Sequence, residues 1–264
     1  MALIRSYAGI TARWLAARAG YLVVNSSRYG LDLFADIKRL CVAWNYSVDV
    51  FLDVGANDGQ TAFLAMHHFP AASVLSFEPH PSTFAALVAN MGTREKFEAF
   101  NLALGTTVGD CELFEYDDPV LNSLVPNAQF AVRFGKEARR VPVRSTTLDS
   151  FCSERGIDSV GVLKIDTEGF ELEVLRGGQG LLARGAVKLI YVEFNDLQPR
   201  EHTFGGALLP IDGILRHHGY RFIATYNDYV VTQGEVFVVS NALFALPAHA
   251  DRAIHTARTL ECRQ

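Results

Sequence analysis

The sequence is poor in the features that mark several large classes of protein. Its four cysteines, at positions 41, 111, 152 and 262, form no C-x-x-C pair, and a chain of 264 residues can bury a core without disulfide bonds. No apolar run reaches the roughly 18 residues of a membrane-spanning helix. Arginines interrupt the apolar N-terminal stretch, which is unlike a signal peptide. These absences lead us to expect a protein of the reducing cytoplasm.

The chain also lacks an excess of positive charge. Its formal net charge is −5 and its pI is about 5.9. It therefore has no broad basic field that would attract nucleic acid through counterion release. Nucleic acid is not an expected partner. Internal repeats and low-complexity segments are absent too, and the length is compatible with one α/β domain that carries extensions.

The most informative feature that is present is a glycine-flanked turn after an apolar strand. Residues 48–52 have the composition of a buried parallel strand that ends on Asp53, and Gly55 and Gly59 flank a tight turn before a helix at 61–70. The turn lacks the middle glycine of G-x-G-x-x-G, which lets a backbone approach a pyrophosphate. An adenosine cofactor without a pyrophosphate fits better, and S-adenosylmethionine is such a cofactor.

The strand-and-helix rhythm continues along the chain. After the first strand, further strands are expected at residues 73–77, 97–104, 160–165, 188–192, 220–225 and 235–239. Helices are expected at 81–87, with Ser82 as N-cap and Gly92 beyond the end, and at 147–152, 170–176 and 211–217. Residues 105–143 break the rhythm, and antiparallel strands with an irregular loop are expected there. The sequence predicts an α/β protein with a mainly parallel, Rossmann-like, seven-stranded sheet and a terminal antiparallel hairpin.

The N-terminal segment has helical spacing of apolar residues from Met1 to about Tyr46. It mixes apolar and arginine side chains, so it could rest on a membrane or a partner, although packing on its own domain is the favoured interpretation. We expect a helical extension over 1–46, the main domain over 47–245 and a C-terminal tail over 246–264.

Polar residues end the predicted strands, where open α/β sheets bind their ligands. The turn from Gly55 to Gly59 could seat the carboxylate of a methionyl group on backbone amides, and Asp53 could face its cationic end. Glu78 lies about 20 residues beyond the turn, at the spacing of a ribose-binding acid. The stretch Asn101-Leu102-Ala103 is placed to meet the adenine ring.

Four segments, together with the order of the strands, resemble the FkbM-type S-adenosylmethionine-dependent methyltransferases over about residues 29–239. The segments are Leu52–Thr61, Phe77–Pro79, Asn101–Gly105 and, most specific of all, Leu163–Gly177. The resemblance implies a class I methyltransferase fold and methyl transfer mostly to oxygen, often on sugars of glycans or natural products. The cofactor-binding positions are then Asp53, Gly55, Ala56, Asn57, Gly59, Thr61, Glu78, Pro79, Asn101, Leu102, Ala103 and Asp166.

The chain departs from the family pattern at two places. Asp58 is acidic where an apolar residue is common, and residues 117–138 match nothing in the pattern. Family substrates also vary. The resemblance therefore implies a small-molecule or glycan acceptor without identifying it, and the sequence does not indicate the oligomeric state.

Methyl transfer to a hydroxyl needs alignment of the nucleophile and a base for its proton. Asp166 and Glu168 follow the strand at 160–165, and Glu193 follows the next strand, so we expect the base among these carboxylates. If Asp166 orients the ammonium group of the cofactor instead, Glu193 or His202 is the base. His80 is a further alternative.

Other chemistry stays open at this stage. Asp166, Glu168, Glu193, Asn195 and Asp196 could hold Mg²⁺ or Ca²⁺ through oxygen ligands, but such acids also serve without an ion, and no metal ligand is predicted. A nicotinamide-dependent oxidoreductase is one alternative function, disfavoured by the missing middle glycine. A cofactor-binding protein without turnover is the other.

Overall fold

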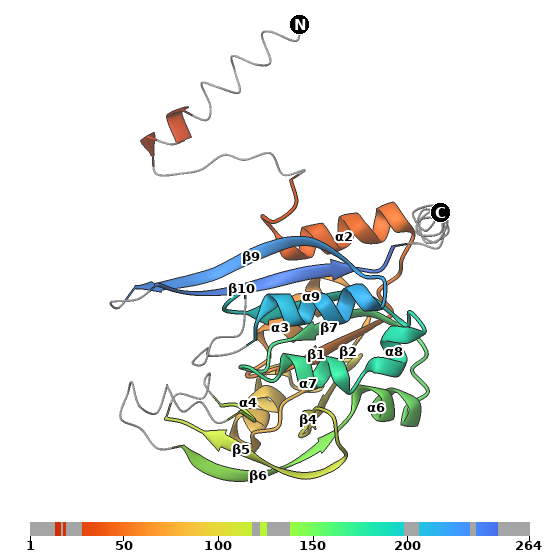
Figure 1. The fold of residues 1–264 in the computed structure, drawn as a ribbon, viewed down its shortest axis with the longest axis vertical. Helices are drawn as coiled ribbons and strands as arrows, with labels where there is room; N and C mark the ends of the chain where they lie inside the picture. Colours follow the sequence, from red (N-terminus) through yellow and green to blue (C-terminus); the bar gives the residue numbers. More distant parts are fainter. Residues whose placement is uncertain are drawn as a thin grey trace, which may run out of the picture.

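The computed structural model describes residues 14–16, 18–19, 28–117, 122–125, 138–197, 206–232 and 236–247. Seven strands form the main sheet in the order β3-β2-β1-β7-β8-β10-β9, and the long strands β9 and β10 lie at its upper end in Figure 1. They are β1 Val50–Val54, β2 Ser73–Phe77, β3 Phe97–Phe100, β7 Val160–Ile165, β8 Val187–Phe194, β9 Arg221–Thr232 and β10 Val236–Ala245. The first five run parallel, and β10 pairs antiparallel with both β8 and β9. The predicted α/β sheet with its terminal antiparallel hairpin is confirmed.

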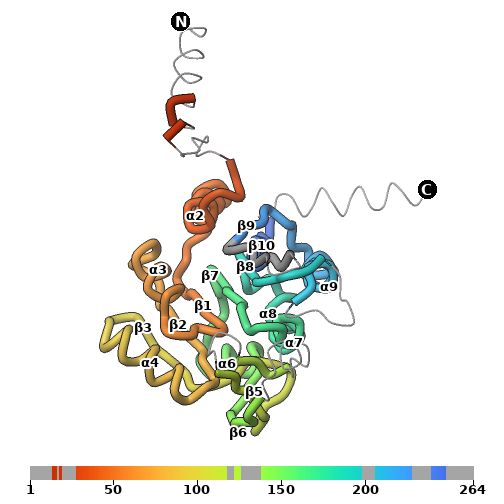
Figure 2. The backbone as a smooth tube through the Cα atoms, turned by 90° about the vertical axis from the view of Figure 1, so that its left-hand side faces the viewer, coloured from red at the N-terminus to blue at the C-terminus, as the bar shows by residue number. Residues whose placement is uncertain are grey.

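Helices cover both faces of this sheet (Figure 2). One face carries α2 Leu33–Trp44, α3 Gln60–His68 and α4 Pro81–Met91, whose buried side chains share one core with the sheet. The other face carries α6 Leu148–Glu154, α7 Glu171–Arg176, α8 Gln179–Ala183 and α9 Leu208–His217, over a second core. Successive strand residues alternate between the two cores: Phe51 lies in the first and Leu52 in the second. This burial on both faces explains the continuous apolar runs of the parallel strands.

Helix α2 begins at Leu33 because the side chain of Asp32 accepts a hydrogen bond from the Ala35 amide at 2.9 Å. On its buried side, Asp36 accepts hydrogen bonds from the Tyr226 hydroxyl at 2.6 Å and from the Gly30 amide at 2.7 Å. The bond from Tyr226 joins α2 to strand β9, and the bond from Gly30 holds the segment that precedes the helix. Residues 1–13 and most of 17–27, on which the predicted N-terminal contact with a membrane or partner falls, lie outside the described residues.

The single strand expected over 97–104 is wrong. Strand β3 ends at Phe100, and the Asn101 side chain then donates hydrogen bonds to the carbonyl groups of Glu78 and Pro79, at 2.9 and 2.8 Å. These bonds turn the chain away from the main sheet. Strand β4, Ala103–Leu104, therefore belongs to a second sheet, of order β4-β6-β5, with β5 Gly109–Glu115 and β6 Arg139–Thr146. The antiparallel strands expected in this region are confirmed by β5 and β6.

Two other local predictions are also corrected. The N-cap of α4 is His80, not Ser82, because the His80 ring nitrogen accepts from the Thr83 amide and Pro81 occupies the first helical position. Asp53 and Glu193 lie inside β1 and β8 instead of following them. Each strand continues past its acid because the next residue still pairs with a neighbouring strand: Val54 pairs with β2 and β7, and Phe194 pairs with β10.

In the part of the chain that the structure describes, no helix is both long and apolar enough to span a bilayer.

Candidate active site

A pocket that is open to solvent lies where the carboxyl ends of the parallel strands face the small sheet. Its wall combines the ends of β1, β2 and β7 with residues 102–104, 113 and 122–124. The predicted site residues that line it are Gly55, Asn57, Glu78, Pro79, Leu102, Ala103 and Asp166. The fold therefore brings together residues from four separate segments of the chain, as the position of the strand ends predicts.

The residues that line the pocket do not include five of the predicted cofactor residues: Asp53, Ala56, Gly59, Thr61 and Asn101. Asn101 holds the backbone of Glu78 and Pro79, as described above. Gly59 has a φ of +99° and ends the turn as the N-cap of α3, where a Cβ would lie 2.9 Å from Leu87. The direct contact of these five residues with a cofactor stays a prediction.

The glycine turn has a conformation that only glycine fits. Gly55 has a φ of +75°, and a Cβ on it would lie 1.7 Å from the Asp166 carbonyl oxygen. The amides of Gly55 and Ala56 donate to the Phe77 carbonyl at 3.0 and 2.9 Å, and the Asn57 amide donates to Glu78 at 3.1 Å. These three amides therefore already donate to groups at the end of the adjacent strand β2. A seat for a carboxylate on this turn stays a prediction.

Glu78 lies at the centre of the pocket wall and is 7% exposed. Its carboxylate accepts hydrogen bonds from the amides of His80, at 2.9 Å, and Asn57, at 3.1 Å. Burial raises the pKa of this carboxyl, and the two amide bonds oppose the shift. A carboxylate offers about four acceptor positions, so Glu78 keeps acceptor capacity for hydroxyl groups in the pocket.

Beneath the turn lies a buried lysine for which the sequence suggested no role. The ammonium group of Lys164 donates to the Gly55 carbonyl and lies 3.3 Å from Asp53 and 3.4 Å from Asp166. Burial alone would lower the pKa of Lys164, but the carboxylates of Asp166 and Asp53 outweigh it and raise the pKa. A lysine within the otherwise apolar run 160–165 was the signal that could have identified this residue.

Asp53 is consequently a buried member of this lysine pair instead of a pocket residue. Its carboxylate also accepts a hydrogen bond from the Ser76 hydroxyl at 3.1 Å. Burial raises the pKa of Asp53, against the opposing effect of Lys164. The pair joins the end of β1 to the end of β7, and Asp53 can act on a ligand through Lys164 and the turn.

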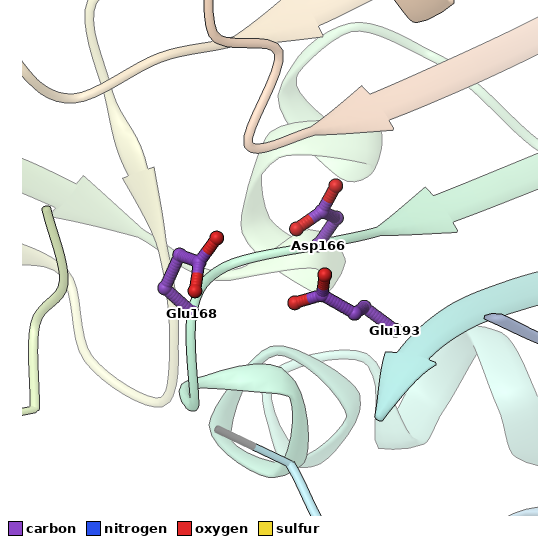
Figure 3. A group of neighbouring side chains, drawn as sticks. All are labelled: Asp166, Glu168 and Glu193. Atoms are coloured by element: carbon purple, nitrogen blue, oxygen red, sulfur yellow. The ribbon is translucent and has the colours of Figure 1, made fainter. Parts of the chain in front are cut away.

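The predicted catalytic carboxylates converge beside the pocket. Oxygen atoms of Asp166, Glu168 and Glu193 all lie within 4.8 Å of one another, and Figure 3 shows the three groups facing a common centre. Burial, then the charges of Asp166 and Glu168, raise the pKa of Glu193 well above its usual value, and Glu193 is in hydrogen-bond contact with Asp166. Such a group can share a proton or accept a divalent cation.

Of the two predicted histidines, the one that the structure describes, His80, is not part of this carboxylate group. His202 lies outside the described residues. The His80 ring is buried and contacts Glu115 at 3.0 Å and Thr83 at 3.1 Å, so it links α4 to strand β5. Of the two further oxygen ligands considered for a cation, Asn195 has a buried side-chain oxygen without a hydrogen-bond partner, and Asp196 pairs with Ala207 through a β-bridge.

These features fit a cofactor that combines a nucleoside with a positive charge. Phe77, Leu102 and Leu113 provide apolar surface for a base, while Glu78 provides acceptor atoms. Asp166 and Glu168 bring negative charge to the wall of the same pocket. S-adenosylmethionine, with its adenosine and its sulfonium, has this combination.

Comparison with known proteins agrees with this chemistry. The methyltransferase FkbM domain family matches residues 53–222. The 2-O-methyltransferase NoeI of Sinorhizobium fredii is 28% identical over 175 residues, which cover 63% of this chain and 69% of NoeI. The 31-O-demethyl-FK506 methyltransferase FkbM of Streptomyces tacrolimicus is 28% identical over 200 residues, 67% of this chain and 74% of that protein. The hexuronic acid methyltransferase AglP of Haloferax volcanii is 27% identical over 169 residues, with coverages of 64% and 65%.

Proposed function

The chain belongs to the methyltransferase FkbM domain family and uses S-adenosylmethionine, and on that premise we propose that it methylates a hydroxyl oxygen of a sugar or a glycosylated small molecule. The observation that carries this proposal is the single pocket in which Glu78 and the carboxylates of Asp166 and Glu168 meet. The similarity to a 2-O-methyltransferase and to a hexuronic acid methyltransferase supports an oxygen acceptor on a carbohydrate. Because the chain belongs to a methyltransferase family, this function takes the place of the alternative of a nicotinamide-dependent oxidoreductase.

We propose that the predicted residues in the pocket wall hold the cofactor. Glu78 would accept the ribose hydroxyls, and Leu102 and Ala103 would contact the adenine. The turn beginning at Gly55 would hold the methionyl end, with its shape fixed from below by Lys164. When bound, S-adenosylmethionine supplies an activated methyl group on a sulfonium.

The carboxylates would then take up the proton of the acceptor hydroxyl. The Asp166 side chain is 35% exposed and lines the pocket, whereas Glu193 lies behind it and is 8% exposed. We propose that Asp166 meets the acceptor and shares the proton that it takes up with Glu193, which lies in hydrogen-bond contact with it. His202 remains the alternative base from the sequence. In-line alignment of the hydroxyl and removal of its proton are what the protein itself adds to the reaction.

Binding of S-adenosylhomocysteine tests the cofactor site, because this product occupies the same pocket. We expect Glu78→Ala to weaken binding roughly 10- to 100-fold in calorimetry, the effect of one or two lost charge-assisted hydrogen bonds of about 1.5–3 kcal/mol. Glu98→Gln is the matched control, because Glu98 pairs with Arg155 on the surface. Unchanged affinity in Glu78→Ala would contradict the assignment.

Transfer of a labelled methyl group to a panel of glycosides tests the reaction. Methylation of hydroxyl groups by the wild type, reduced in Asp166→Asn, is the expected result. Tight S-adenosylhomocysteine binding without transfer across the panel would favour a cofactor-binding protein that lacks turnover. The same experiment identifies the acceptor, which we propose to be a small molecule or a glycan.

We also propose the organisation and location that the sequence predicts. Residues 47–245 would form the methyltransferase domain, residues 1–46 an N-terminal extension and residues 246–264 a tail. The proposed location is the cytoplasm, supported by the scattered cysteines: the structure gives Cys41, Cys111 and Cys152 as free thiols.

A further inference from the structure

The segment that follows Asp166 has a backbone conformation that needs support. Glu168 has a φ of +54° and Gly169 a φ of +103°, so two consecutive residues lie in the left-handed region. This region is unfavourable for a residue with a side chain such as Glu168. The shape of this segment fixes where the carboxylates of Asp166 and Glu168 lie in the pocket wall, so whatever holds the segment also determines the geometry of the proposed site.

The fully buried side chain of Glu171 provides that support from within. One of its carboxylate oxygens, Oε1, accepts three hydrogen bonds: from the Thr167 amide at 3.0 Å, the Thr167 hydroxyl at 3.1 Å and the Gly169 amide at 3.0 Å. Glu171 thus binds the residues on both sides of Glu168. Ser123, which forms a β-bridge with Phe114 of β5, provides a second contact, since its hydroxyl donates to the Glu168 carbonyl at 2.7 Å.

The surroundings of Glu171 indicate that its function is to accept these bonds. Its other oxygen, Oε2, is buried and has no hydrogen-bond partner. A Cβ on Gly206 would lie 2.6 Å from that oxygen, so the absence of a side chain at 206 leaves room for the carboxyl group. The Glu171 carboxyl is thus enclosed between the 167–169 segment and Gly206. It is also missing from the pocket wall, so it does not contact a ligand there.

We propose that Glu171 is a positioning residue for methyl transfer, which holds residues 167–169 so that Asp166 and Glu168 face the acceptor. The effect on turnover rests on the proposed function, whereas the effect on the shape of the segment does not. The sequence places Glu171 inside the most specific family segment but gives no reason for an acid there. The structure supplies that reason, because one oxygen atom satisfies three donors of a strained turn.

The test compares Glu171→Gln, whose amide oxygen can still accept the three bonds, with Glu171→Leu, which has no acceptor. We expect Glu171→Gln to keep methyl-transfer turnover within about tenfold of the wild type, because neutral hydrogen bonds are roughly half as strong as charge-assisted ones. We expect the methyl-transfer turnover of Glu171→Leu to fall about 100-fold, because the reacting groups are then misplaced. Glu173→Leu is the matched control, since Glu173 pairs with Arg176 at the surface of the same helix.

A second measurement reports on the conformation of residues 167–169 directly and needs no substrate for methyl transfer. Amide hydrogen exchange at Thr167 and Gly169, followed by NMR, should be protected in the wild type and Glu171→Gln and fast in Glu171→Leu. If Glu171→Leu does not fold, Thr167→Val removes one of the three bonds and should speed exchange at Gly169. Exchange as slow as in the wild type in Glu171→Leu or in Thr167→Val would overturn the proposal. An equal loss of turnover in folded Glu171→Gln and Glu171→Leu would overturn it too. Absence of turnover in the wild type would refute the proposed function and leave the exchange result to decide on Glu171.

Discussion

At the scale of single residues, the site depends on charged groups buried beneath the pocket as much as on those that face it. Lys164 contacts the turn through the Gly55 carbonyl and lies between the carboxylates of Asp53 and Asp166. One ammonium group therefore holds both the backbone of the glycine turn and the side chain of Asp166, the acid that we propose to meet the acceptor. Neither contact depends on a bound ligand, so the site is preorganised by the fold.

Replacing this lysine should destabilise the whole domain. Lys164→Met leaves Asp53 buried without its cation, and breaking a buried pair in this way costs roughly 3–5 kcal/mol in free energy of unfolding at pH 7. Urea unfolding measures this loss. Lys38→Met, at an exposed position of α2, is the control and should change little. A loss below about 1 kcal/mol would show that Asp53 does not need Lys164, because exposed pairs contribute only that much.

The destabilisation in Lys164→Met should shrink at low pH. The folded-state pKa of Asp53 is already raised by burial, and removal of Lys164 raises it further. An acid with a raised folded-state pKa favours folding below its unfolded pKa, and this contribution is lost as pH rises through the folded pKa. The difference between variant and wild type is therefore largest at neutral pH and smaller toward pH 4. Asp53→Asn added to Lys164→Met should recover part of the lost stability at pH 7.

The sequence allowed a role to be predicted for a single residue only where the position of that residue on a strand indicated it. Acids at strand ends, such as Glu78 and Asp166, were recognisable because the ends of parallel strands meet at one edge. The roles of Lys164 and Glu171 were not, since each depends on contacts with segments distant in the chain or on a turn conformation. Nor could spacing show that Asp53 points beneath the pocket instead of into it.

At the scale of helices and strands, the parallel core was predictable because its strands are apolar on both faces. Strands β2 and β7 begin and end where the sequence places them. The break after β3 was not predictable, because it depends on the Asn101 side chain binding carbonyl groups of the neighbouring strand. The length of β9 and β10 also exceeds the predicted hairpin, since their pairing continues beyond the apolar stretches.

The contact between α2 and β9 makes a prediction about elements. Tyr226→Phe removes the hydroxyl that donates to the buried carboxylate of Asp36. Asp36 keeps its bond from the Gly30 amide, but the loss of one hydrogen bond to a charged group costs roughly 1.5–3 kcal/mol, so we expect a loss of that size in urea unfolding. The affinity for S-adenosylhomocysteine should stay unchanged, because neither residue lines the pocket. Tyr29→Phe, at an exposed position, is the control, and equal stability of the two variants would contradict a role for this bond.

At the scale of the whole molecule, the pocket wall brings together parts of the chain that lie far apart in the sequence. Its wall takes Gly55 and Glu78 from the main sheet, Leu113 and Ser123 from the small sheet side, and Phe170 from the segment before α7. A ligand that fills it contacts all of these at once. Cofactor binding should therefore stabilise the folded molecule as one unit, and not only the turn.

Thermal unfolding measures this effect. S-adenosylhomocysteine at about 100 times its Kd adds about 2.7 kcal/mol by mass action. For a domain of this size, each kcal/mol raises Tm by about 2–4 °C, so we expect a rise of roughly 5–11 °C. NAD⁺ at the same concentration should give no comparable rise, since the turn lacks the glycine that admits a pyrophosphate. In Glu78→Ala the rise should shrink at a fixed ligand concentration, because the higher Kd lowers the ratio that sets it. A wild-type rise with NAD⁺ alone would instead show that the pocket binds a dinucleotide, against the function proposed for it.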